Sequence, residues 1–267
     1  MIGDSALAAL LRRDRAIVLA ALLAVAALAW TDVLHLAHAM SDTAAMPGMD
    51  MDAAGMMSPV FGQWSPGHFM TIFAMWTVMM IGMMTPSVAP MILIYTQVAR
   101  AQTGARPFAS ALWFTGGYLL AWVGFSLLAT LTQWGLEQLA LLSPMMAGTS
   151  HRFGGLLLIA AGVYQWLPLK YSCLSRCRAP LSFVMEHGGF QARATGSLRL
   201  GLQHGLYCIG CCWALMSLLY VGGVMNPLWI AGLMVLVLLE KLLPGWRQLA
   251  KASGISAAAL GVWYLLR

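Results

Sequence analysis

The chain has 267 residues, of which 60% are hydrophobic and only 9% carry a charge. Soluble domains carry about 25% charged residues, so this composition excludes an ordinary soluble enzyme, and apolar content in almost every segment excludes a disordered tail. A membrane-spanning helix needs about 20 mostly apolar residues. The length therefore accommodates six or seven spans, and the sequence predicts an all-α, polytopic transmembrane helix bundle.

Seven apolar runs follow one another along the chain. Each is continuous rather than alternating in polarity, which favours helices over barrel strands. The second run contains Pro86 and Pro90, and the sixth begins after the break at Gly222-Gly223 and Asn226-Pro227. The runs cover approximately residues 16–36, 68–98, 109–134, 153–169, 198–221, a stretch ending near 243, and 255–266. They predict about seven spans.

The basic residues indicate how these spans are oriented. If the N-terminus is cytoplasmic, 13 of the 15 lysines and arginines lie in cytoplasmic segments, and only Arg152 and Arg267 lie outside them. Segment 32–67 contains aspartates but no lysine or arginine. Because cytoplasmic loops are enriched in basic residues, the sequence predicts a multi-pass membrane protein with a cytoplasmic N-terminus. Topology also explains the net charge of +6, so we expect the lipid bilayer as a partner and no nucleic acid.

The first apolar run has two interpretations. Its basic start, its apolar stretch and the sequence Ala37-His38-Ala39 also resemble a signal peptide with an A-x-A cleavage site, and cleavage would leave six spans. The length of the apolar stretch favours an uncleaved anchor. The sequence thus divides into an N-terminal span or signal anchor (1–36), a periplasmic loop (37–67) and a membrane domain (68–267).

The loop before the second run is rich in side chains that bind copper. Met46, Met49 and Met51, called here the loop methionines, are interleaved with aspartates, and His35 and His38 precede them. Thioether sulfur suits Cu(I), and imidazole also takes Cu(II). Exposed methionines gain nothing from burial, so accidental methionines in a polar loop explain the pattern less well. The loop predicts copper capture outside the membrane.

The second run carries methionines at helical spacing. Met75, Met79 and Met83 form one stripe at about 100° per residue. Apolar packing is the simpler interpretation, since methionine often fills gaps between helices. Nearby Pro86 and Pro90 favour a functional role, because bent spans with small polar residues often line sites at membrane depth. We therefore include Met79 and Met83 among the predicted copper ligands.

The fifth run places four metal-binding side chains on one helix face. Relative to His204, Cys208 lies about 40° around the helix, Cys211 about −20° and Cys212 about 80°. The three cysteines fit within about one turn, close enough to contribute to one thiolate site. The alternative is a set of small buried residues that let helices approach. Three cysteines and a histidine on one face favour a metal site.

Two further cysteines, Cys173 and Cys177, lie in the predicted cytoplasmic segment after the fourth run. Their i, i+4 spacing suits a helical metal pair or a dithiol, and they could complete a site with the fifth run. Thiols on the cytoplasmic side argue against structural disulfides. Glu240 and Lys241 end the sixth run on the same side, and the simpler interpretation of that pair is a solvated helix end.

Four blocks of the chain resemble a bacterial family of uncharacterised integral membrane proteins described as predicted metal-binding. The blocks are MMIGMMTPSVAP (79–90), CLSRC (173–177), HGLYCIGCCWALM (204–216) and EKLLPG (240–245). The resemblance extends from about residue 69 to the end, and the third block is highly specific. It implies metal binding without an established reaction, so whether the protein is an enzyme stays open.

The residues and the resemblance together predict a metal-handling protein of the bacterial inner membrane. We expect it to bind and transfer or transport Cu(I), with Zn as the alternative metal, through the outer loop and the His/Cys face of the fifth run. Its partner would be a periplasmic copper carrier or a membrane cuproenzyme. Two other hypotheses are a membrane thiol-disulfide oxidoreductase, using Cys173 and Cys177 with Cys208 and Cys211, and a metal-centred membrane enzyme.

Overall fold

The computed structural model describes residues 4–44, 65–103, 107–142, 150–191 and 193–267, and this part of the chain is built from helices. The predicted all-α class is confirmed. The helices are α1 (Asp4–Ala44), α2 (Pro66–Thr103), α3 (Pro107–Gln138), α4 (His151–Tyr164), α5 (Pro168–Arg178), α6 (Pro180–Glu186), α7 (Ala194–Ser217), α8 (Leu219–Gly222), α9 (Pro227–Leu242) and α10 (Trp246–Leu266).

Five stretches of the described chain are long and apolar enough to cross a membrane. They are Arg15–His38, Pro66–Gln102, Phe108–Gln138, Ala194–Gly222 and Trp246–Leu266. Helices α4 and α5 meet at a bend of 63° and together make a sixth candidate. The predicted sixth run forms α9, whose 16 residues reach about 24 Å, short of a hydrocarbon core of about 30 Å. A membrane protein with five or six candidate spans results.

Helices α1 and α10 extend furthest beyond the apolar runs that predicted them. Helix α1 continues to Ala44, so the first part of the predicted loop is helical. Helix α10 begins at Trp246 rather than near residue 255. The guanidinium of Arg247 lies 5.3 Å from the centre of the Trp246 ring. An exposed basic side chain of this kind lets a helix start before its apolar stretch begins.

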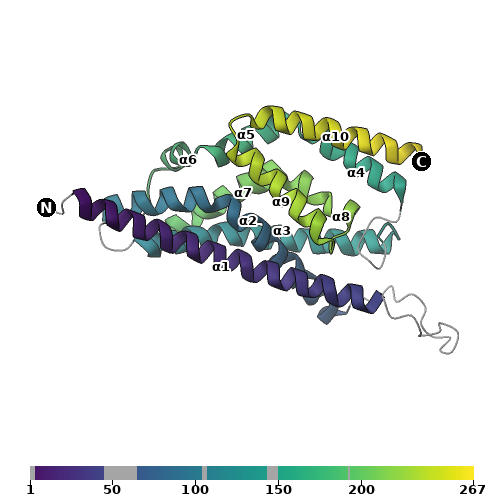
Figure 1. Cartoon of the computed structure of the whole chain (residues 1–267), viewed down its shortest axis with the longest axis horizontal. Helices are drawn as coiled ribbons and strands as arrows, with labels where there is room; N and C mark the ends of the chain where they lie inside the picture. Colours follow the sequence, from purple (N-terminus) through teal and green to yellow (C-terminus); the bar gives the residue numbers. More distant parts are fainter. Residues whose placement is uncertain (1–3, 45–64, 104–106, 143–149, 192) are drawn as a thin grey trace.

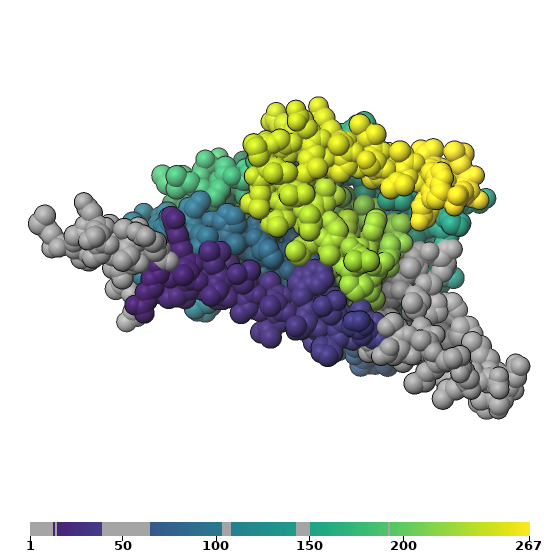
Figure 2. Space-filling view, viewed as in Figure 1, coloured from purple at the N-terminus to yellow at the C-terminus, as the bar shows by residue number. Residues whose placement is uncertain are grey.

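The long helices lie side by side and successive ones run in opposite directions (Figure 1). The tightest neighbours are α3 with α7, α4 with α10, α2 with α3, and α1 with α2. In the space-filling view α1 forms a ridge along one edge and α10 lies along the opposite edge (Figure 2). The N-terminus and the C-terminus lie at opposite ends of the bundle (Figure 1).

Glycines allow two of these helix pairs to approach closely. A Cβ at Gly201 of α7 would clash with the backbone of Phe114 in α3. A Cβ at Gly162 of α4 would lie 2.7 Å from the carbonyl oxygen of Gly254 in α10, and the reverse contact measures 2.8 Å. Small residues at interfaces are how helices pack when lipid removes the hydrophobic drive to associate. The α3–α7 contact fixes the face of α7 that carries the cysteines.

Candidate metal centre

The predicted face of α7 is directed into the bundle. His204, Cys208, Cys211 and Cys212 are all buried, with exposed fractions of 3% or less. They share a face because α7 is regular from Ala194 to Ser217, so the helical period brings them to one side. The structure therefore gathers these four side chains where the sequence placed them.

Helix α5 brings two more thiols to the same place. It packs against α7, and the Cys177 side chain contacts those of Cys208 and Cys211. Cys173 lies over Gly210, where an added Cβ would be 2.8 Å from the Cys173 sulfur. The five cysteines are free thiols. Thiols that are 31 to 39 positions apart in sequence thus form one cluster, called here the thiol cluster, made of Cys173, Cys177, Cys208, Cys211 and Cys212.

Two polar groups from other helices, one from α9 and one from α3, lie beside the Cys208 sulfur. The Lys241 ammonium of α9 lies 2.9 Å from it, and the Tyr118 hydroxyl of α3 lies 3.2 Å from it. Lys241 also donates to the hydroxyl of Ser87 in α2 at 2.9 Å, and Tyr118 donates to the Met84 carbonyl at 3.3 Å. A positive charge beside a sulfur favours the thiolate, which is the form that binds metals. Cys208 is the most polar point of the cluster.

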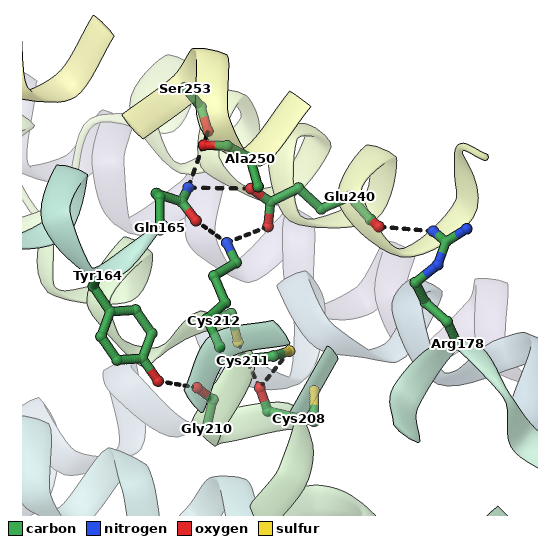
Figure 3. Close-up of polar contacts among 11 residues, drawn as sticks. Tyr164, Gln165, Arg178, Cys208, Gly210, Cys211, Cys212, Glu240, Ala250 and Ser253 are labelled. Carbon is green, nitrogen blue, oxygen red and sulfur yellow. Dashed lines mark hydrogen bonds and ion pairs between the residues drawn. The ribbon is translucent and has the colours of Figure 1, made fainter. Parts of the chain in front are cut away.

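The other two α7 thiols are turned toward their own helix. Cys211 and Cys212 donate to the Cys208 carbonyl at sulfur–oxygen distances of 3.0 and 2.9 Å (Figure 3). Within the described ranges, no group of three or more His, Cys, Asp or Glu side chains is already arranged to hold a metal ion. Rotation about the Cα–Cβ bonds of Cys211 and Cys212 is therefore needed before either sulfur joins Cys208 on one ion.

His204 is buried in an aromatic cage. Its ring lies 5.0 Å from Phe183, 5.9 Å from Phe114 and 6.0 Å from Tyr118, measured between ring centres. Its Nδ1 is buried and has no hydrogen-bond partner among the described residues. A buried nitrogen without a partner is costly. The Nδ1 of His204, one helical turn before Cys208, is therefore available to make a hydrogen bond or to bind a metal ion.

A buried ion pair lies beside the thiol cluster. Lys170 of α5 and Glu240 of α9 are 2.6 Å apart and at most 2% exposed. Gln165 bridges them, accepting from Lys170 and donating to Glu240 and to Ser253 of α10 (Figure 3). The interpretation of Glu240 and Lys241 as a solvated helix end is therefore wrong, since both side chains are buried. Glu240 pairs with Lys170 and Lys241 contacts Cys208, and both partners are distant in the sequence.

Arg178 completes the attachment of α5 to α9. Its guanidinium donates to the carbonyl oxygens of Glu240 and Lys241 at 2.8 and 2.7 Å, which satisfies the C-terminal carbonyls of α9. The ion pair at one end of α5 and this cap at the other hold the helix that carries Cys173 and Cys177. The polar contacts thus support the thiol cluster from outside.

The remaining predicted ligands are distributed over α1, α2 and the segment between them. Met79 and Met83 are buried in α2, before Pro86 and Pro90. His35 and His38 lie on exposed positions of α1 rather than in a loop. The loop methionines lie outside the described residues. The structure thus joins the cysteines to His204 and leaves the two α1 histidines apart from them.

Comparison with known proteins adds a family to this geometry. Residues 73–264 match the family model described as PpoB2, a copper chaperone. The match contains the thiol cluster, His204, Lys241, Met79 and Met83. No curated protein and no solved structure matches the chain.

Proposed function

The chain belongs to the PpoB2 copper chaperone family, and from this premise we propose that it carries Cu(I) on the thiol cluster within the membrane. The ion is the cargo of the protein rather than a resident cofactor. Thiolate and thioether ligands select Cu(I) over harder ions. The thiol cluster and the methionines of α2 supply these two ligand types and make Zn the less favoured cargo.

The observation that carries the proposal is the set of contacts at Cys208. Its sulfur contacts Cys177 of α5 and lies 2.9 Å from the Lys241 ammonium in the buried centre of the bundle. Purely structural cysteines need no cation and no second helix of thiols. A thiolate site for a soft cation uses both, because the ammonium stabilises the thiolate and the second helix supplies further thiols.

The proposed route runs from the outer face inward. The loop methionines, with His35 and His38, would collect the ion, and Met79 and Met83 would pass it along α2 toward Cys208. The link from α2 to the cysteines is short, because the Tyr118 hydroxyl contacts both the Met84 carbonyl and the Cys208 sulfur. A periplasmic copper carrier or a membrane cuproenzyme is the expected partner at the outer side, with the N-terminus in the cytoplasm.

The proposal is tested on the full chain, purified in detergent under reducing conditions. We expect the protein to retain copper, and the variant with Cys208, Cys211 and Cys212 changed to serine to lose most of it. Cu(I) should protect the thiols from maleimide in the wild type. His204→Ala should weaken this protection and Cys208→Ser should abolish it. Equal maleimide labelling with and without Cu(I), in folded protein, would contradict the proposal.

A membrane thiol-disulfide oxidoreductase is the second candidate function, because Cys177 contacts both Cys208 and Cys211. In that function two thiols would lose two electrons and two protons in all, forming one sulfur–sulfur bond, and a quinone or another disulfide would be reduced by the same two electrons and two protons. Mass spectrometry after incubation with a quinone distinguishes the two functions. A disulfide between α5 and α7 that forms and reduces reversibly supports the second; unchanged thiols support copper carriage.

A further inference from the structure

A cavity separate from the thiol cluster lies between α1 and α2, beside the turn that precedes α9. Its volume is about 130 Å³, and its lining includes Asp32 of α1, Thr71, Met75 and Met79 of α2, and Met225 of the turn. Contacts between α1 and α9 keep this side together, and the two segments meet on the visible face of the bundle (Figure 2). Three methionines and one aspartate thus line the same space.

The carboxylate is the informative member of this set. Asp32 lies six residues before the end of the candidate span Arg15–His38, at an exposed position beside the cavity. An ionisable side chain in a candidate span is costly where lipid surrounds it and often marks a functional site. Methionines that only packed would need no charge next to them. A monovalent soft cation would satisfy both kinds of group, because sulfur holds it and the carboxylate balances its charge.

The size and position of the cavity fit such an ion. A water molecule occupies about 30 Å³ of liquid, so 130 Å³ holds one ion with a few waters. Met79 borders the cavity, and Met83 follows one turn later, about 6 Å further along α2. The Tyr118 hydroxyl then connects the backbone carbonyl of Met84 with the Cys208 sulfur. The cavity stands at the start of the line that ends at the thiol cluster.

We infer that this cavity is a second Cu(I) site, in which Met75, Met79 and Met225 provide thioether sulfur and Asp32 provides the compensating charge. The inference rests on the proposed function and adds an entry site to it. Asp32 lies before the region that matches the family model, and Met225 lies 150 positions after Met75, so the fold brings together side chains that are distant in the sequence. The experiment distinguishes this ion from two alternatives, a lipid chain in the cavity and a packing defect that binds nothing.

The experiment removes the thiol cluster and the loop methionines and asks whether one copper equivalent survives. The background chain carries serine at all five cysteines of the thiol cluster and leucine at the loop methionines. In this background we expect one equivalent of Cu(I) per chain under reducing conditions, measured against a chromophoric Cu(I) chelator. Changing Met75, Met79 and Met225 together to leucine should remove it. Met70→Leu is the matched control, because Met70 is on α2, is 58% exposed and does not line the cavity.

Asp32→Asn tests the role of the charge. We expect it to weaken Cu(I) binding about tenfold in the background chain, as the loss of supporting groups around a metal does, and to leave the thermal midpoint of the metal-free protein near its starting value. Zn²⁺ should not displace the ion. If Asp32→Asn leaves the affinity unchanged, the carboxylate has no part in the site and the inference is overturned.

The remaining outcomes are equally decisive. No bound copper in a folded background chain, or copper that persists after the three leucine changes, overturns the inference while leaving the thiol cluster untouched. If the background chain does not fold, the three leucine changes are made in the otherwise natural chain, where copper content should fall by one equivalent. An unchanged content there also overturns it. Failure of the thiol cluster to bind copper would instead appear as unaltered maleimide labelling of the natural chain.

Discussion

Removing Glu240 should destabilise the protein strongly, because it would leave Lys170 charged and buried without its partner. The two side chains are at most 2% exposed, and their nitrogen and oxygen lie 2.6 Å apart. At an effective dielectric constant near 20, charges at this distance attract by about 6 kcal/mol, and desolvation of both ions offsets much of that gain. Breaking a buried pair costs about 3–5 kcal/mol. Glu240→Ala should therefore lower the free energy of unfolding by about 4 kcal/mol.

The assay is the thermal midpoint of the metal-free protein in detergent. With about 2–4 °C per kcal/mol for a chain of this size, the midpoint should fall by roughly 10 °C. The double variant Lys170→Met, Glu240→Leu should recover most of this loss, because no unpaired charge remains buried. Glu186→Ala is the matched control. It removes an Arg176–Glu186 pair of similar length, 2.7 Å, whose side chains are 39% and 54% exposed, and should change stability by at most about 1 kcal/mol.

The reasoning fails if Glu240→Ala and Glu186→Ala lower the midpoint equally. It also fails if the double variant is as unstable as Glu240→Ala. In the first case burial would not set the cost of the missing partner. In the second case the loss would come from packing rather than from the charge left on Lys170.

Three further predictions follow from the contacts around α7 and from the charge pattern. Lys241→Met should lower the reactivity of Cys208 toward maleimide, because the cation beside that sulfur is lost. It should also slow Cu(I) release to a chelator, by a smaller factor. Unchanged maleimide reactivity would contradict the assigned contact. Gly201→Leu should prevent α3 and α7 from packing and lower the yield of folded protein, as judged by size-exclusion chromatography, whereas an unaltered yield would show that the close contact is dispensable. Reporter fusions at Gly55 and Gly189 should report a periplasmic and a cytoplasmic location, and the opposite pair would reverse the proposed copper route.

The arrangement of the four predicted ligands on α7 could be predicted because it depends on one helix. Positions 204, 208, 211 and 212 share a face under any regular helical period, and the structure leaves that face buried. The membrane class was predictable for a similar reason, since composition alone decides whether a chain has enough charge to remain in water. Both inferences use local information.

The partners of that face were not predictable from the sequence. Lys241 lies 33 positions from Cys208, and Tyr118 lies 90 positions from it. The ion pair of Lys170 and Glu240 joins residues 70 positions apart. A sequence met alone shows a lysine and a glutamate at the end of an apolar run, which is typical of a solvated helix end. Only the packing of α5 and α9 around α7 reveals that both are buried.

Helix boundaries depended on features that hydropathy does not register. The predicted loop was expected to begin at residue 37, but the alanine-rich sequence that follows has no glycine or proline before Pro47, and α1 continues to Ala44. The start of α10 was missed because Arg247 and Lys251 interrupt the apolar pattern without interrupting the helix. Charged residues with long side chains are compatible with a helix end in the membrane interface.

A chaperone has to hold its ion and also release it, and the contacts of Cys208 provide a physical basis for both. The Lys241 ammonium lies 2.9 Å from the sulfur as a positive partner. Cu(I) bound to the same sulfur would lie close to that ammonium, and two like charges at short range repel. The lysine has a second partner in the Ser87 hydroxyl of α2. In the proposed function Lys241 would stabilise the thiolate before loading, lose that contact when copper binds and regain it when copper leaves, so that the same residue would make loading reversible.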